Sequence, residues 1–308
     1  MVERPLRELD TEARAGQFED LGDRATHEVV RAVVAGHDAV VAAVLEAADQ
    51  IATLADAAAE RLARGGRVIY AGAGAAGRAA ATDASEWAPT FNVPERTVIA
   101  LLAGAHASPG SAAEAAAEDD AAAGAAELDR QNPGPADLVI GVSASGRTPY
   151  TLGVLKAARD ARALTGAIVC QSGSPLAELA DYPVHVPVGP EIVAGSSRLK
   201  AGTAQKLVLN AFSTAVMARR GRILGNLMGC LRISNEKLRQ RAEAVCQAAT
   251  GCDPAAARRA LEESGDTLEV ALVMLRAQVD AGAARAALEA TGGHLPHALE
   301  RLAGEAGA

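Results

Sequence analysis

The sequence predicts an α/β protein in which a doubly wound parallel sheet of five strands is flanked by helices. Short runs of aliphatic and β-branched residues alternate with alanine-rich helical segments, and helical periodicity dominates both ends of the chain. Strands that alternate with helices favour right-handed crossovers and a parallel sheet covered on both faces. We therefore expect an N-terminal helical segment over residues 1–65, an α/β domain over 66–225 and a small all-helical subdomain over 226–308.

The elements follow from the spacing of apolar residues along the chain. Between residues 29 and 62 apolar side chains recur every three or four positions, which predicts one long amphipathic helix that ends at Gly65 and Gly66. The predicted strands are "RVIYA" (67–71), "TVIALL" (97–102), "DLVIGVS" (137–143), "GAIVCQ" (166–171) and the weaker "PVHVP" (183–187). Further helices are expected at about 112–129, 151–163 and 201–219.

The C-terminal part contains a short internal repeat. The stretch "ALEESGDTLEVAL" (260–272) resembles "ALEATGGHLPHAL" (287–299) at an offset of 27 residues. Two copies are too few for a solenoid, which needs at least about three. We interpret them as a small helical appendage, either a lid or a dimer contact.

Composition excludes several classes of partner. The 308 residues carry a formal net charge of -8 and only 2% aromatic residues, so neither a nucleic acid nor an anionic membrane surface is an expected partner. The four cysteines form no C-x-x-C pair, which predicts reduced thiols and no metal site. The first residues are charged and no apolar run reaches about 18 residues, so we expect a cytoplasmic protein.

A glycine-rich loop follows the first predicted strand, with the spacing Gly72-x-Gly74-x-x-Gly77. A dinucleotide site with this motif also needs an acidic residue at the end of the next strand, and "TVIALLAGAH" supplies none. The alternative is a loop whose backbone N–H groups approach a smaller anion or a sugar. We expect no nicotinamide and no other cofactor.

Two further loops favour an anion site. "GVSASGRTPY" (141–150) places Ser143, Ser145 and Thr148 between a strand and a helix, so hydroxyls and free N–H groups meet there. "AGSSRLKAGTAQK" (194–206) repeats the pattern with Ser196 and Ser197 before another helix. Ordinary helix capping is the alternative for either loop alone. Both loops at one sheet edge favour a phosphate site.

Several longer stretches carry a specific pattern: "GAGAAGR", "DASEWAPTF", "SASGRTPY", "VGPEIVAGSSRLKAGTAQK" and "NEKLRQRA". Together they resemble the N-acetylmuramic acid 6-phosphate etherase family, which carries a sugar isomerase (SIS) domain and is related to the glucokinase regulatory protein. The resemblance runs from about residue 20 to the C-terminal helices. It implies an SIS fold, an amino-sugar phosphate as the ligand, no cofactor, and a homodimer whose sites form near the subunit interface.

The resemblance also implies a carbon–oxygen lyase that cleaves the lactyl ether at C3 of the sugar by elimination and then water addition. One group removes the C2 proton and another protonates the departing oxygen, and two carboxyl groups with different pKa values suffice. The catalytic glutamates map to Glu86 and Glu118. Glu114 is the rival of Glu118, but Ser111-x-x-Glu114 matches a capping box, with the Glu114 carboxylate expected on the N–H of Ser111. We assign protonation of the leaving oxygen to Glu86 and the C2 proton or the water to Glu118.

The ligand-binding residues implied by the resemblance come from the same loops. For Arg78 and Arg147 a salt bridge at the sheet edge is the alternative, and for Glu191 it is a role in loop structure. The set is Gly74, Ala75, Ala76, Gly77, Arg78, Ser143, Ser145, Gly146, Arg147, Thr148, Glu191, Ser196, Ser197 and Lys200.

Three departures from the family pattern bear on the substrate. The first loop has Ala75 and Ala76 where the family has two hydroxyls, Trp87-Ala88-Pro89 replaces C-P-P, and the N-terminal T-E-x-R-N-P motif is reduced to "TEARAG" (11–16). Losing one hydrogen bond to a charged group weakens binding by roughly ten- to a hundredfold. Two alternatives therefore remain beside the etherase: a sugar-phosphate regulator without turnover, and a diverged SIS lyase or isomerase acting on another sugar.

Overall fold

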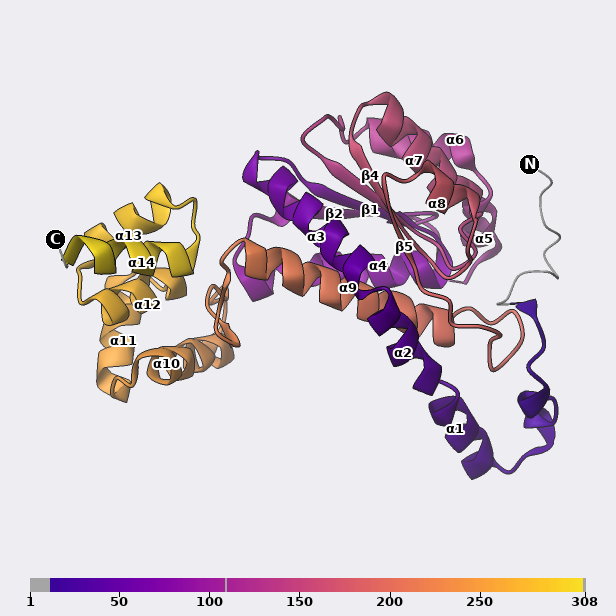
Figure 1. Ribbon diagram of the computed structural model, residues 1–308, viewed down its shortest axis with the longest axis horizontal. Helices are drawn as coiled ribbons and strands as arrows, with labels where there is room; N and C mark the ends of the chain where they lie inside the picture. Colours follow the sequence, from indigo (N-terminus) through magenta and orange to yellow (C-terminus); the bar gives the residue numbers. More distant parts are fainter. Residues whose placement is uncertain (1–11, 109, 307–308) are drawn as a thin grey trace. The chain divides into compact units, whose positions relative to one another are not determined.

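A computed structural model describes residues 12–108 and 110–306 and contains a parallel sheet of five strands in the order β2-β1-β3-β4-β5 (Figure 1). The predicted fold class is confirmed. The strands are β1 (Val68–Gly72), β2 (Val98–Leu102), β3 (Leu138–Val142), β4 (Leu164–Val169) and β5 (Tyr182–His185). From β1 the chain first adds β2 on one side, and β3 to β5 then follow on the other side, so the strand order switches between β1 and β3. Ligands of open α/β sheets bind beyond the carboxyl ends of the strands at such a switch point.

One face of the sheet is covered by α5 (Ala112–Glu118), α6 (Ala121–Asp129), α7 (Pro149–Asp160) and α8 (Pro175–Leu179). Alternate strand residues such as Ile69 and Val139 enter a buried cluster with Leu128 of α6 and Leu155 of α7. The helix predicted over 112–129 is two helices, because Asp120 accepts a hydrogen bond from the backbone N–H of Ala123 and begins α6.

The opposite face is covered by α3 (Ala48–Ala63), α4 (Gly74–Phe91) and α9 (Lys200–Arg219) (Figure 1). The ring of Tyr70 on β1 meets Phe212 of α9 edge-on, with ring centroids 6.3 Å apart. Its hydroxyl donates to the buried carboxylate of Asp83 on α4 at 3.0 Å, and Ser213 donates to the same carboxylate at 3.1 Å. These contacts hold α4 and α9 together against β1.

The single long N-terminal helix predicted over 29–62 is wrong. The chain forms α1 (Thr26–Ala35), α2 (Asp38–Glu46) and α3 in succession, preceded by the 3₁₀ turns η3 (Gly16–Phe18) and η4 (Leu21–Asp23). The first break falls at Gly36, where a Cβ atom would lie 2.7 Å from the side chain of Ile192. Glycine therefore lets a distant loop pack at the break, and periodicity alone does not report this contact.

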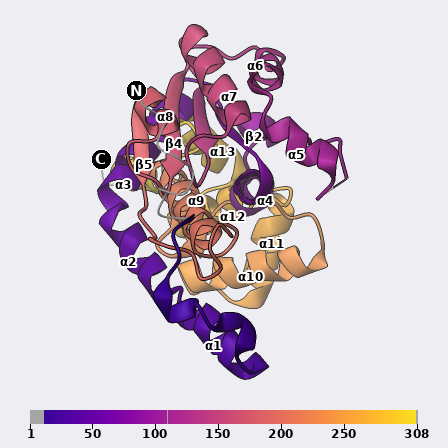
Figure 2. The same cartoon turned by 90° about the vertical axis from the view of Figure 1, so that its right-hand side faces the viewer.

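The helices after α9 form a core of their own. A short hairpin of β6 (Ile223–Leu224) and β7 (Leu227–Met228) precedes the helices α10 (Glu236–Thr250), α11 (Pro254–Glu263), α12 (Leu268–Ala277), α13 (Ala281–Ala290) and α14 (Leu295–Ala306) (Figure 2). Helices α11 and α12 are repeated by α13 and α14, and Asp253 and Asp280 cap the first helix of each pair through N–H groups three residues ahead. The 27-residue repeat is thus a repeated helical hairpin.

The chain divides into two compact units. The first contains residues 12–84 and 96–213, as far as they are described, and the second contains 85–95 and 214–306; the 3₁₀ turn η5 (Glu95–Thr97) spans the boundary between residues 95 and 96. The segment 85–95 packs within the second unit, where the backbone N–H of Arg232 donates to Pro89 O and Asn92 Nδ2 donates to Glu269. Among the described helices, none has the length and apolar character needed to cross a bilayer.

An ion pair closes the amino end of the sheet. The guanidinium of Arg67 lies 2.7 Å from the carboxylate of Asp137, which is only 5% exposed and also accepts the backbone N–H groups of Arg67 and Gly134. The hydrogen bonds that the Arg67 guanidinium donates to Asp137 raise the pKa of Arg67. The pair joins the starts of β1 and β3, at the end of the sheet opposite the loops that follow these strands.

We expect Asp137→Ala to lower the free energy of unfolding by about 3 kcal/mol, because it leaves a partly buried guanidinium and two N–H groups without their acceptor. Urea unfolding followed by circular dichroism measures the change. Asp160→Ala, at an exposed position at the end of α7, is the matched control and should change it by no more than about 0.5 kcal/mol. Equal effects of the two substitutions would contradict the structural role of the pair.

Candidate functional site

A pocket of about 260 Å³ lies in the first unit, where β1 and β3 end side by side. The last paired residues are Gly72 of β1 and Val142 of β3, and the loops that follow them form two walls of the pocket. The lining residues are Glu12, Ala73, Gly74, Ala75, Ala76, Glu118, Ser143, Ala144, Ser145, Thr148, Ser197 and Gln205. The structure therefore brings together parts of all three loops singled out in the sequence.

The glycines of the first loop have different tasks. Gly77 packs against β1, and a Cβ atom there would meet the backbone of Gly72 at 2.6 Å. Gly74 has φ of +53° at the first position of α4, and a Cβ atom there would lie 2.8 Å from Oε1 of Glu118. Gly74 thus leaves room for the carboxylate of Glu118. The first turn of α4 has backbone N–H groups without partners inside the helix, and such groups at a helix N-terminus favour an anion.

The β3–α7 loop presents hydroxyl groups. Ser143 Oγ lies 3.0 Å from Thr148 Oγ1 and accepts the backbone N–H of Gly146, while Ser145 Oγ accepts the N–H of Arg147. Thr148 occupies the N-cap position of α7, but its side chain makes no capping hydrogen bond. Ordinary capping therefore does not account for this hydroxyl, which faces the pocket instead.

The loop before α9 contributes Ser197, whereas Glu191 and Lys200 have structural positions. Glu191 is fully buried, and its two carboxylate oxygens accept the backbone N–H groups of Lys200 and Ala201 at 2.9 Å each. The Glu191 carboxylate thus caps the first turn of α9, which agrees with the alternative of a role in loop structure. Lys200 donates through Nζ to Pro190 O at 2.9 Å, and burial lowers its pKa while Glu191 opposes this change.

Arg78, Arg147, Gly77, Gly146 and Ser196 are not among the described residues that line the pocket. Arg78 instead forms an ion pair with Glu114 at 2.5 Å, in agreement with the salt-bridge alternative.

Glu114 and Glu118 lie one turn apart on α5 and differ in environment. Ser111 caps α5 by accepting the N–H of Glu114, as the capping-box motif predicts, but the Glu114 carboxylate accepts from Gly110 rather than from Ser111. With Arg78 also bound, Glu114 is held in the scaffold.

Glu118 is the last residue of α5 and reaches the pocket. Burial raises the pKa of its carboxyl group, the charges of Glu114 and Asp119 raise it further, and Arg78 opposes them. A carboxylate with a raised pKa is a stronger base when ionised, which suits a group that removes a proton from carbon.

Glu86 lies in the second unit, on the later turns of α4, and is exposed. It lies within the helix, before the last turn of α4. Its Cα is roughly 18 Å along the helix from that of Gly74, since each helical residue advances the chain by about 1.5 Å. Trp87 beside it is 1% exposed.

Glu12 and Gln205 are the polar lining residues that the sequence analysis missed, and Ala73 and Ala144 are the apolar ones. A Cβ atom on Gly195, whose φ is +75°, would lie 2.8 Å from Oε2 of Glu12. Glu12 therefore lies against the loop before α9. The sequence did offer a signal, since Glu12 belongs to "TEARAG" and Gln205 to "AGTAQK", but only folding brings the two segments to one pocket.

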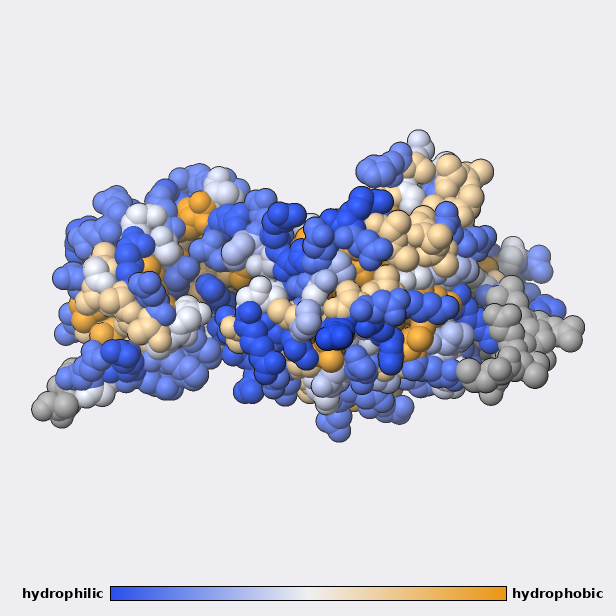
Figure 3. All heavy atoms as spheres, turned by 90° about the horizontal axis from the view of Figure 1, so that it is seen from above, coloured by the Kyte–Doolittle hydropathy of each residue, from blue (hydrophilic) through white to orange (hydrophobic). Residues whose placement is uncertain are grey.

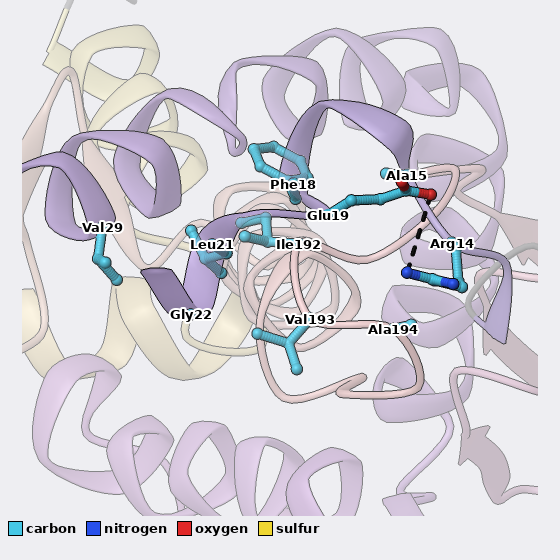
Figure 4. Close-up of a pocket in the computed structure, with 10 residues that line it drawn as sticks. All are labelled: Arg14, Ala15, Phe18, Glu19, Leu21, Gly22, Val29, Ile192, Val193 and Ala194. Atoms are coloured by element: carbon cyan, nitrogen blue, oxygen red, sulfur yellow. Dashed lines mark ion pairs between the residues drawn. The ribbon is translucent and has the colours of Figure 1, made fainter. Parts of the chain in front are cut away.

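A second pocket of about 500 Å³ shows how the N-terminal segment lies on this loop. Figure 4 shows Phe18 and Leu21 from the N-terminal segment around the same space as Ile192 and Val193. The remaining side chains on its rim include the ion pair of Arg14 with Glu19, at 3.8 Å. Apolar packing of this kind places the segment that carries Glu12.

The two glutamates of α5 should respond oppositely to neutralisation. Glu114→Gln should lower the free energy of unfolding at pH 7 by about 1–3 kcal/mol, because the charged partner of Arg78 is lost. Glu118→Gln should not lower it. Ionisation of Glu118 is disfavoured in the folded state, so its contribution to stability is present below the unfolded pKa near 4.5 and is lost as the pH rises through the raised folded pKa.

Urea unfolding of both variants at pH 7 and at pH 4 measures these effects. The difference between Glu118→Gln and the parent protein should be more favourable to the variant at pH 7 than at pH 4. The opposite pH dependence would show that the folded state stabilises the charged form of Glu118.

Two domain families match the chain. The glucokinase regulatory protein N-terminal SIS domain matches residues 47–159, and the SIS domain matches residues 121–215. Among solved structures, a phosphoheptose isomerase from Francisella tularensis aligns with a TM-score of 0.50 and 19% sequence identity, covering 63% of this chain and 100% of that one. At this identity the likeness concerns the fold alone.

Relatives with higher identity extend over nearly the whole chain. N-acetylmuramic acid 6-phosphate etherase from Rubrobacter xylanophilus is 48% identical over 270 residues, which cover 88% of this chain and 89% of the relative. Proteins of the same name from Cutibacterium acnes and Deinococcus radiodurans are each 44% identical, with 86–88% of this chain and 87–88% of the relatives covered. The chain therefore belongs to the N-acetylmuramic acid 6-phosphate etherase family.

Proposed function

We propose that the protein is a carbon–oxygen lyase that cleaves the lactyl ether of N-acetylmuramic acid 6-phosphate or a closely related amino-sugar phosphate. The observation that carries the proposal is the pocket at the ends of β1 and β3, where a carboxyl group of raised pKa lies beside a cradle of hydroxyls and helix N-termini. Family membership and the likeness of the curated relatives support the substrate class.

The phosphate occupies the cradle between the two glycine-containing loops. The first turns of α4 and α7 both begin at this pocket, and their free N–H groups and dipoles favour an anion. Ser143, Ser145 and Thr148 add hydroxyl donors. Ala75 and Ala76 contribute backbone groups only, so the β3–α7 loop carries more of the phosphate binding than the first loop does.

The reaction needs one base and one acid. Glu118, when ionised, removes the C2 proton of the open-chain sugar as the bond between C3 and the lactyl oxygen breaks, which forms a double bond between C2 and C3. The departing oxygen takes a proton, and water then returns a proton to C2 and a hydroxyl to C3. The products are lactate and N-acetylglucosamine 6-phosphate.

Glu86 supplies the proton for the departing oxygen in this scheme. It reaches the pocket from the second chain of a homodimer. Along α4, Glu86 is roughly 18 Å from the phosphate cradle at Gly74, a longer span than one sugar ring bridges. We therefore infer that Glu86 of a second copy of the chain serves the pocket. This assignment rests on the family motif and on the geometry of a single helix.

Exposed apolar residues support the homodimer. Val30, Val34, Val41 and Leu45 on α1 and α2 are 55–68% exposed, at spacings that repeat within each helix. The face of the molecule in Figure 3 is mainly hydrophilic, with apolar residues scattered over it. A stripe of exposed apolar residues on α1 and α2 is a candidate contact between copies of the chain. We also infer a cytoplasmic location, which the four free cysteines in the described part of the chain support.

A regulatory protein that binds a sugar phosphate without turnover is the second candidate function. The match of residues 47–159 to the glucokinase regulatory protein domain favours it, as do the missing hydroxyls at Ala75 and Ala76. The carboxyl group of Glu118 in the pocket favours the lyase, because binding alone does not call for a base beside the ligand.

The purified protein should release lactate from N-acetylmuramic acid 6-phosphate, and Glu118→Gln and Glu86→Gln should each lower kcat by at least about a hundredfold, since general acid–base groups contribute on the order of 10²–10⁴. A lactate dehydrogenase-coupled assay measures the release. Glu114→Gln is the matched control on α5 and should retain most of kcat. Binding of the sugar phosphate without lactate release would instead identify a regulator.

Co-expression of Glu86→Gln with Glu118→Gln tests whether the site is shared between copies. In a randomly mixed dimer population, about half of the dimers are mixed and one of their two sites has both glutamates, so about a quarter of the parent activity should return. Glu86→Gln co-expressed with the double variant supplies the control and should stay inactive. Complete inactivity of the first mixture, with mixed dimers verified by differential tags, would place both glutamates of a site on one chain.

A further inference from the structure

Gln205 is a buried side chain without an assigned task. It lies in the second turn of α9, is 1% exposed and lines the pocket at the carboxyl ends of β1 and β3. Its side-chain nitrogen Nε2 has no hydrogen-bond partner among the residues that the structure describes. A buried amide donor without an acceptor destabilises a folded protein, so a residue of this kind in a pocket indicates an acceptor that arrives with a ligand.

The neighbours of Gln205 decide which part of the ligand it meets. Gln205 and Ser197 lie on one continuous stretch, the end of the loop before α9 and the first turns of that helix, and Glu12 lies against the same loop at Gly195. The proposed phosphate cradle consists instead of the two loops after β1 and β3. The carboxylate of Glu12 disfavours a phosphate group beside the loop before α9. Neutral oxygens of a sugar, in contrast, accept from the amide and donate to the carboxylates.

The N-terminal segment keeps this side of the pocket in place. The contact of Glu12 with Gly195 joins the segment to the loop that carries Ser197, and apolar residues of the same two stretches line one pocket a few residues further on (Figure 4). The arrangement forms a polar wall for the sugar, separate from the loops that face the phosphate.

We propose that Gln205 is a specificity-determining residue, whose amide Nε2 donates a hydrogen bond to a neutral oxygen of the sugar and thereby orients it over Glu118. The proposal rests on the proposed function for the identity of the pocket as a phosphosugar site. It extends that function by dividing the pocket into a phosphate side and a sugar side.

The test compares two ligands on Gln205→Met, which conserves length and removes both polar atoms. Isothermal titration should show that N-acetylglucosamine 6-phosphate binds about tenfold more weakly than to the parent protein, the loss of one hydrogen bond. The affinity for inorganic phosphate should stay within about twofold. The melting temperature should be unchanged or higher, since the variant no longer buries an unpartnered donor.

Thr151→Val is the matched control for burial. Thr151 on α7 is 0% exposed, its Oγ1 also has no partner among the described residues, and it does not line the pocket. The variant should be as stable as the parent protein or more stable, and should bind both ligands as the parent does. It shows what removal of a buried unpartnered group does when no ligand is concerned.

Three results would overturn the proposal. Unchanged binding of the sugar phosphate excludes a ligand contact, an equal loss for both ligands places Gln205 at the phosphate, and a lower melting temperature with loss of both ligands makes it structural. Failure of the parent protein to release lactate, together with selective loss of sugar-phosphate binding in Gln205→Met, would reject the lyase function and keep the assignment of Gln205.

Discussion

The parallel pairing of β1 with β3 is the constraint on which the rest of the site depends. The two strands are in register from Val68 and Leu138 to Gly72 and Val142, so their last residues lie next to each other at one edge of the sheet. Helix α4 then leaves on one face and α7 on the other. The first turns of two helices, with their free N–H groups, therefore open onto the same space, and an anion is the ligand that this arrangement favours.

The glycines in these loops allow tight turns and also leave space for carboxylate groups. At Gly74 and at Gly195 the backbone has a positive φ, and at each position a missing Cβ atom leaves room for a carboxylate oxygen, from Glu118 and from Glu12 respectively. The phosphate cradle and the acidic groups can then lie within one small pocket. Without this spacing, the acidic side chains would be excluded from the site by the loops that bind the anion.

A buried acidic group beside other acidic groups and an anion site lowers the stability of the folded protein when it is ionised. The raised pKa of Glu118 reflects burial and the neighbouring acidic residues, and the pocket also retains the unpartnered donor of Gln205. Other buried polar groups of the first unit are paired, such as Asp137 with Arg67 and Glu191 at the start of α9, although Thr151 Oγ1 has no partner among the described residues. An unpartnered donor that lines a pocket is typical of a site where a ligand completes the hydrogen bonding.

The sequence by itself determined the parallel sheet, its five strands within a few residues, the repeated C-terminal hairpin and the loops around the pocket, because periodicity and turn residues act locally. It did not determine which polar residues face the ligand. Glu191, in a predicted loop, and Glu118, inside a predicted helix, were both candidate site residues, yet the first caps α9 and the second reaches the pocket. Tertiary structure alone made that choice, together with the break at Gly36 and the arrival of Glu12 and Gln205, since each depends on contacts between segments far apart in the chain.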